Sequence, residues 1–139
     1  MAKTVLIVDD VAFVRKTLRE IFTEARYEVV GEAADGREAI ALYGKLRPNL
    51  VTMDIVMPQM SGLEATKQIL KLDSEAKIVI ISAMGQENLV MEAVNVGAKD
   101  YILKPFSAAD VLKTADRAML GTEDQGGHAA RPAPRREAR

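Results

Sequence analysis

Polar residues that could do chemistry follow four separate apolar runs of this 139-residue sequence. Asp9 and Asp10 come directly after the first run, and Asp54 comes after another. Ser82 and Lys104 follow two more. If the fold brings these side chains together, the carboxylates can bind a divalent cation, while the hydroxyl and the ammonium can bind phosphoryl oxygens.

Taken singly, several of these residues also have a purely structural interpretation. Asp10 alone would suit the N-cap of a helix, because a carboxylate accepts hydrogen bonds from the free amides of the first turn. Ser82 would suit a solvated loop, and Lys104 a charged surface. A cap needs only one carboxylate, however, so Asp9 stays unexplained. Asp54 is also hard to explain in this way, because no helix pattern begins immediately after it.

The repulsion among the carboxylates favours a joint function. Two carboxylates about 4 Å apart repel each other by about 4 kcal/mol at an effective dielectric constant of about 20. A cluster of three is tolerated when a cation joins it, and oxygen ligands without a nearby His or Cys favour Mg²⁺. Three aspartates are then offset by Mg²⁺ and Lys104. The residues therefore predict a metal-assisted phosphoryl acceptor with Asp54 as the acceptor.

The elements that must position these residues alternate between two hydrophobic periodicities. Apolar and β-rich runs predict strands over 5–8, 28–33, 50–53, 78–81 and 101–103. Apolar residues at helical spacing predict helices over 12–25, 39–46, 63–70, 89–96 and 111–119. Asp35-Gly36 predicts a turn or cap, and Gly97 predicts the end of the fourth helix.

Such alternation implies right-handed crossovers and a parallel sheet with helices on both faces, the doubly wound α/β class. In this class the ligand site lies beyond the carboxyl ends of the strands. All the polar residues singled out above follow strands, so they converge on that edge.

The composition excludes several other classes of protein. A hydrophobic content of 48% over 139 residues suits one ordinary core. The 19 Lys and Arg against 20 Asp and Glu argue against an electrostatic binder of nucleic acid or membrane. The absence of cysteine excludes disulfides, thiolate metal sites and cysteine catalysis. No apolar run reaches the roughly 18–20 residues that span a bilayer, so we expect a soluble, cytoplasmic protein.

The last part of the sequence differs from the rest. Residues 121–139 contain no Val, Leu, Ile, Phe or Met, but three Gly, two Pro and four Arg. Such a segment cannot bury enough apolar surface to offset its ordering entropy. We therefore predict one functional domain over residues 2–120 and a disordered tail over 121–139.

Five segments of the sequence together resemble response-regulator receiver domains, and most closely the single-domain chemotaxis regulators of the CheY type. The resemblance covers residues 3–119. The matching segments are VLIVDD at 5–10, MDIVMPQMSG at 53–62, ISAMG at 81–85, GAKDY at 97–101 and KPF at 104–106.

The resemblance implies a flavodoxin-like (βα)5 fold with strand order 2-1-3-4-5 and a role for each site residue. Asp54 would accept the phosphoryl group from a histidine kinase. Mg²⁺ would be bound by the side chains of Asp10 and Asp54, by Asp9 partly through water, and by the backbone carbonyl of Val56.

The resemblance also assigns the residues that respond to phosphorylation. Lys104 would pair with a phosphoryl oxygen, and its peptide bond to Pro105 would be cis. Ser82 would move to hydrogen-bond the phosphoryl group, and Tyr101 would change rotamer in step.

The function implied is that of a signalling protein, which catalyses only its own phosphorylation and dephosphorylation. As a monomer, it would bind an effector, most readily the flagellar motor switch in chemotaxis, and a phosphatase would be a further partner. The alternative is a phosphorelay intermediate, or a stand-alone receiver acting on a non-flagellar partner.

The effector would bind the face formed by the fourth helix, the fifth strand and the fifth helix. The candidates to line this surface are Glu87, Asn88, Met91, Asn95, Lys99, Tyr101 and Lys113. For Met91, packing in the core is an equal alternative.

Two other classes of protein fit the sequence less well. A flavin-binding module of this fold needs a Ser-, Thr- or Gly-rich phosphate loop after the first strand, where Asp9 and Asp10 would repel a phosphate. A dehalogenase-type phosphatase has two aspartates after its first strand with one residue between them (D-x-D). This chain has the adjacent Asp9 and Asp10, and a separate Asp54.

Overall fold

A computed structural model of the chain describes residues 2–124, in which five strands alternate with five helices. The strands are β1 (Lys3–Val8), β2 (Tyr27–Ala33), β3 (Leu50–Asp54), β4 (Ile78–Ser82) and β5 (Asp100–Leu103). The helices are α1 (Ala12–Glu24), α2 (Gly36–Leu46), α3 (Gly62–Leu72), α4 (Glu87–Val96) and α5 (Ala108–Asp124). Every predicted strand and helix is present, with bounds that differ by a few residues.

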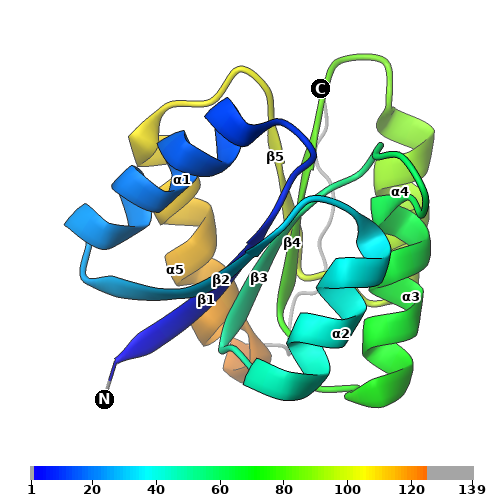
Figure 1. Ribbon diagram of the computed structural model, residues 1–139, viewed down its shortest axis with the longest axis horizontal. Helices are drawn as coiled ribbons and strands as arrows, with labels where there is room; N and C mark the ends of the chain where they lie inside the picture. Colours follow the sequence, from blue (N-terminus) through cyan, green and yellow to red (C-terminus); the bar gives the residue numbers. More distant parts are fainter. Residues whose placement is uncertain (1, 125–139) are drawn as a thin grey trace.

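The strands form one parallel sheet in the order β2-β1-β3-β4-β5, which confirms the predicted doubly wound topology. This order places β3, and therefore Asp54, at the centre of the sheet. Figure 1 shows α1 and α5 on one face of the sheet and α2, α3 and α4 on the other.

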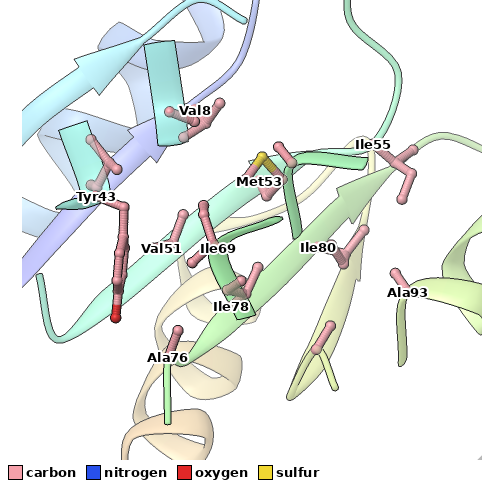
Figure 2. Close-up of a cluster of buried hydrophobic side chains, with 14 of the residues drawn as sticks. Val8, Tyr43, Val51, Met53, Ile55, Ile69, Ala76, Ile78, Ile80 and Ala93 are labelled. Atoms are coloured by element: carbon pink, nitrogen blue, oxygen red, sulfur yellow. The ribbon is translucent and has the colours of Figure 1, made fainter. Parts of the chain in front are cut away.

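The central strands divide their side chains between two hydrophobic cores, because successive residues of a strand point to opposite faces. In β4, Ile78 and Ile80 pack towards α2, α3 and α4, while Val79 and Ile81 pack towards α1 and α5. Figure 2 shows the first of these cores, where Ile78 and Ile80 lie near Val51 and Met53 of β3 and Ile69 of α3. Burial on both faces explains why these strands are apolar runs without alternation.

Local capping fixes where several helices begin and end. Asp35 accepts a hydrogen bond from the Glu38 N–H (2.9 Å) at the start of α2, as the sequence predicted. Ser61 caps α3 in the same way. Gly97 ends α4 with φ 127°, a backbone conformation that favours glycine.

The last helix extends past the predicted end of the domain. Helix α5 continues to Asp124, so the predicted boundary at residue 120 falls inside a helix. The rest of the predicted tail, from residue 125 onward, lies outside the described residues. Among the helices described, none is long and apolar enough to cross a membrane.

Candidate functional site

The register of the sheet brings the predicted site residues to one edge. Val8 pairs with Met53, so Asp9 and Asp54 are the next residues on adjacent strands. Asp54 pairs with Ile81, which places Ser82 one residue beyond. Ser82 pairs with Leu103, which places Lys104 one residue beyond that. In Figure 1 these strand ends all lie at the upper edge of the sheet.

The charged side chains meet at this edge. The ammonium nitrogen of Lys104 lies 3.3 Å from Asp9 Oδ2 and 3.4 Å from Asp54 Oδ1. One carboxylate oxygen from each of Asp9, Asp10 and Asp54 lies within 4.8 Å of the other two. Asp9 is fully buried and Asp54 is 5% exposed, whereas Asp10 is open to solvent. The structure therefore brings together the carboxylates and the ammonium that the sequence singled out.

Asp9 is held by three hydrogen bonds. Its N–H donates to the carbonyl of Ala33 (3.0 Å), and its carbonyl accepts from Arg15 Nη1 (2.8 Å). Its Oδ1 accepts from the Val11 N–H over 2.9 Å. The other carboxylate oxygen, Oδ2, is buried and has no hydrogen-bond partner, although Lys104 Nζ lies at ion-pair distance.

Asp10 does not cap α1, which excludes the structural alternative for this residue. The N-cap position is Val11, and no side chain accepts a hydrogen bond from the first-turn amides of α1. The Val11 N–H itself donates to Asp9 Oδ1, not to Asp10.

The surroundings of Asp54 disfavour its ionised carboxylate when no cation is bound. Burial, followed by the charge of Asp9, raises the pKa of Asp54 to about 7, although Lys104 opposes that rise. Burial lowers the pKa of Lys104, but the charges of Asp54 and Asp9 outweigh burial and the net shift is upward. The positive charge of Lys104 alone is therefore not enough to keep the Asp54 carboxyl group fully ionised at neutral pH.

The residues fit a hard divalent cation such as Mg²⁺. The donor set is three carboxylates, and one of its oxygens, Asp9 Oδ2, is buried without a hydrogen bond. Such an oxygen is expected beside an ion or an ion-bound water. Within residues 2–124, this is the one group of three or more acidic, His or Cys side chains that is placed to hold a metal.

The other predicted site residues lie at the end of β4, within β5, or just after β3 and β5. Ser82 is buried, and its carbonyl accepts a hydrogen bond from the Lys104 N–H over 2.7 Å. The Lys104–Pro105 peptide bond is cis, as the resemblance implied. Val56 is half exposed in the loop directly after Asp54. Tyr101 is half-buried and packs against the core on the α2–α4 face.

Most of the residues predicted to line the effector surface are exposed to solvent. Met91 is 52% exposed, so the core-packing alternative for this residue is wrong. Glu87, Asn88, Asn95, Lys99 and Lys113 are exposed as well. These candidate effector residues are therefore available to a partner.

Two residues of the site were not predicted. Gly62 lies against the backbone of Asp54, where a Cβ atom would collide with the Asp54 carbonyl group. Arg15, which lies in the helix predicted over 12–25, reaches back from α1 to the Asp9 carbonyl. The glycine in MDIVMPQMSG was visible in the sequence, but no local pattern indicates how far a helical arginine reaches.

Comparisons with known proteins agree with this geometry. The sequence profile of the response regulator receiver domain matches residues 5–116. The chemotaxis protein CheY of Thermotoga maritima is 53% identical over 117 residues, which cover 84% of this chain and 98% of that protein. Protein CcdB of Bacillus subtilis is 51% identical over 115 residues, which cover 83% of this chain and 96% of that protein.

A solved structure, the CheX–CheY–BeF3–Mg complex from Borrelia burgdorferi, is similar with a TM-score of 0.77 and 41% identity. That similarity covers 80% of this chain and 84% of the matched chain.

Proposed function

Since the chain belongs to the response regulator receiver domain family, we propose that it is a phosphorylation-dependent switch in which Asp54 accepts a phosphoryl group from a histidine kinase. The observation that carries this proposal is the meeting of Asp9, Asp10 and Lys104 around a nearly buried Asp54. A purely structural charge cluster would not need a strand-end carboxylate with a pKa of about 7.

The chemistry is a transfer from nitrogen to oxygen. A carboxylate oxygen of Asp54 attacks the phosphorus of a phosphohistidine, the P–N bond breaks, and the electron pair of that bond stays on the imidazole. The product is an aspartyl phosphate. Lys104, which lies 3.4 Å from Asp54 Oδ1, can donate to a phosphoryl oxygen as charge accumulates there.

Asp9, Asp10 and Asp54, together with the backbone carbonyl of Val56, would hold Mg²⁺. When bound, the cation supplies positive charge beside the transferred group. In its presence the Asp54 carboxyl ionises more readily than its raised pKa implies, because an adjacent positive charge favours the carboxylate.

The same residues can convert phosphorylation into a change of conformation. The new charge is relieved if Ser82 and Lys104 close on the phosphoryl group, and Tyr101 of β5 would then change rotamer. Taking the active state from about 1% to 99% requires about 5.5 kcal/mol of differential stabilisation. Several charge-assisted hydrogen bonds, at roughly 1.5–3 kcal/mol each, are of that size.

The effector would bind the exposed surface of α4, β5 and α5, and the flagellar motor switch in chemotaxis is the effector that we favour. The 53% sequence identity between this chain and the chemotaxis protein CheY of Thermotoga maritima supports this choice. The similarity to a CheX–CheY complex supports a phosphatase as a further cytoplasmic partner.

A second candidate function is that of a receiver acting outside the flagellar motor, either in a phosphorelay or on another effector. The observation that favours it is that protein CcdB, which is nearly as identical to this chain as the Thermotoga protein, is not named as a chemotaxis protein.

The acceptor role is tested by incubating the chain with a small phosphodonor and Mg²⁺. The wild type should gain one acid-labile phosphoryl group, and chelation of the metal should abolish the gain. Asp54→Asn should remain unlabelled, because an amide cannot attack phosphorus. Labelling of Asp54→Asn at the wild-type rate would show that the acceptor is another residue.

A further inference from the structure

Arg15 links the candidate metal site to the outer strand of the sheet. It projects from α1, and its Nη1 donates to the Asp9 carbonyl over 2.8 Å. Its Nε donates to Glu32 Oε1 of β2 over 3.0 Å. The side chain is 20% exposed, so it is mostly enclosed between the helix and the sheet.

Glu32 holds this guanidinium in place. The same carboxylate accepts from Arg19 Nε on its other oxygen, over 2.6 Å. The bond from Arg19, and less strongly that from Arg15, lowers the pKa of Glu32 against the effect of burial. Glu32 is therefore ionised at neutral pH and fixes the orientation of the planar Arg15 group.

The contact matters because of the peptide group that it touches. The Asp9 carbonyl belongs to the peptide that joins Asp9 to Asp10, so the Arg15 bond fixes the plane from which Asp10 emerges. Asp10 is exposed, and packing does not fix its carboxylate. Its position over Asp54 depends on the loop backbone.

We propose that Arg15 is a positioning residue that sets the affinity of the Asp9–Asp10–Asp54 site for Mg²⁺. Mg²⁺ requires near-ideal octahedral geometry at about 2.0–2.1 Å, so a small displacement of one carboxylate weakens its binding. The inference rests on the proposed metal site, but it concerns a residue that would not touch the metal.

The electrostatic effect of Arg15 has the opposite sign. A positive charge near the site repels a cation, so removal of the charge alone would make Mg²⁺ bind more tightly. Positioning predicts weaker binding on the same change. The direction of the shift therefore separates the two effects.

Arg15 could instead act only by attaching α1 to β2, and a matched control distinguishes this structural role from positioning of the metal site. Arg19 pairs with the same Glu32 carboxylate from the same helix, and it makes no contact with the Asp9 carbonyl that Arg15 holds. Arg19→Gln removes an ion pair of the same kind and leaves the contact with the Asp9 carbonyl in place.

The experiment is a calorimetric Mg²⁺ titration of the full chain without a phosphodonor, with folding checked by circular dichroism. Arg15→Gln should bind Mg²⁺ about tenfold more weakly than the wild type, in the range typical for partners that orient metal ligands. Arg15→Lys should also bind more weakly, because a lysine lacks the planar group in which separate nitrogens, Nε and Nη1, reach Glu32 and Asp9. Arg19→Gln should stay within about twofold of the wild type, because it leaves the contact that orients the metal ligands intact.

A second cation and a second variant extend the test. Ca²⁺ accepts more flexible geometry, so Arg15→Gln should lose less affinity for Ca²⁺ than for Mg²⁺. Glu32→Gln keeps Arg15 but weakens its anchor, and should shift Mg²⁺ affinity in the same direction as Arg15→Gln by a smaller factor. This variant carries the test if Arg15→Gln does not fold.

Three outcomes would overturn the inference. Unchanged or tighter Mg²⁺ binding by Arg15→Gln would show that Arg15 does not position the site. Equal losses in Arg15→Gln and Arg19→Gln would show that the network acts only as a structural tie. A wild-type chain that binds no Mg²⁺ would overturn the proposed metal site itself, and the inference with it.

Discussion

Gly62 lies directly against the main chain of Asp54, so closely that a Cβ atom on Gly62 would lie 2.9 Å from the Asp54 carbonyl carbon. The Gly62 N–H also donates to the carbonyl of Ile55 over 2.9 Å. The first residue of α3 is therefore packed on the strand end that carries Asp54, and any side chain at this position must displace that strand end.

We predict that Gly62→Ala lowers both stability and phosphorylation. The added methyl group meets backbone, which cannot rotate away, so a loss of about 1–3 kcal/mol in unfolding free energy is expected. Urea unfolding measures the first effect, and the rate of labelling by a small phosphodonor measures the second.

The matched control for this prediction is Gly44→Ala on α2. A Cβ atom at Gly44 would have nothing within 4 Å. Because alanine favours a helix more than glycine does, Gly44→Ala should gain about 0.5–1 kcal/mol and label normally. If Gly62→Ala matched this control in both measurements, the close approach would have no energetic consequence.

We also predict that the metal-free chain becomes less stable as the pH rises through neutrality. The pKa of Asp54 is raised to about 7 by burial and by Asp9, above its value in an unfolded chain. A carboxyl raised in this way contributes stability below its unfolded pKa, and that contribution is lost as the pH rises through about 7. Between about pH 5 and pH 8 the loss should be roughly 2–3 kcal/mol.

This pH dependence is measured by unfolding in a chelator, with Asp54→Asn as the reference. The asparagine variant should lack the loss, and added Mg²⁺ should reverse it in the wild type at high pH. Parallel stability profiles for the wild type and Asp54→Asn would contradict the assignment of this loss to Asp54.

A third prediction concerns Lys104. Its ammonium lies 3.4 Å from Asp54 Oδ1 and is one of the groups that lower the pKa of Asp54. In Lys104→Met the pKa of Asp54 should rise further, because that stabilising charge is gone. A carbon NMR titration of the Asp54 carboxyl group in metal-free protein measures the shift. Lys113→Met, at an exposed position of α5, is the control and should leave that pKa unchanged.

The fourth prediction concerns the effector. If the chain serves the flagellar motor, beryllofluoride with Mg²⁺ should strengthen its binding to a flagellar switch protein by about 5–150-fold, the usual range of coupling between sites. A pull-down with and without the mimic measures this change. Binding that the mimic leaves unaltered would rule out the motor proposal and favour the non-flagellar alternative.

The sequence predicted the edge that carries Asp54 because strands buried on both faces consist mostly of apolar residues, and a polar residue stands at the end of each. Val5–Val8, Leu50–Met53 and Ile78–Ile81 were clear for this reason, and their register put Asp9, Asp54 and Ser82 side by side. The cis bond at Pro105 followed from the resemblance alone.

Other features depended on tertiary geometry that no local pattern contains. Asp9 and Asp10 are adjacent in sequence, yet one is fully buried and the other exposed, because the chain turns between β1 and α1. Arg15 was indistinguishable from a solvated helical charge until the angle between α1 and β2 was known. Helix α5 extends beyond the last strongly apolar residues, so hydrophobic spacing placed its end too early.

The direction of the strands has a practical consequence for joining this fold to other groups. β1 begins, and α5 ends, at the edge of the sheet opposite the strand ends that carry Asp54. Near that far edge Lys77, just before β4, donates to the Met119 carbonyl of α5 over 2.9 Å. A fluorophore, affinity handle or second domain attached at either end of the described fold would therefore start on the side away from an incoming phosphodonor.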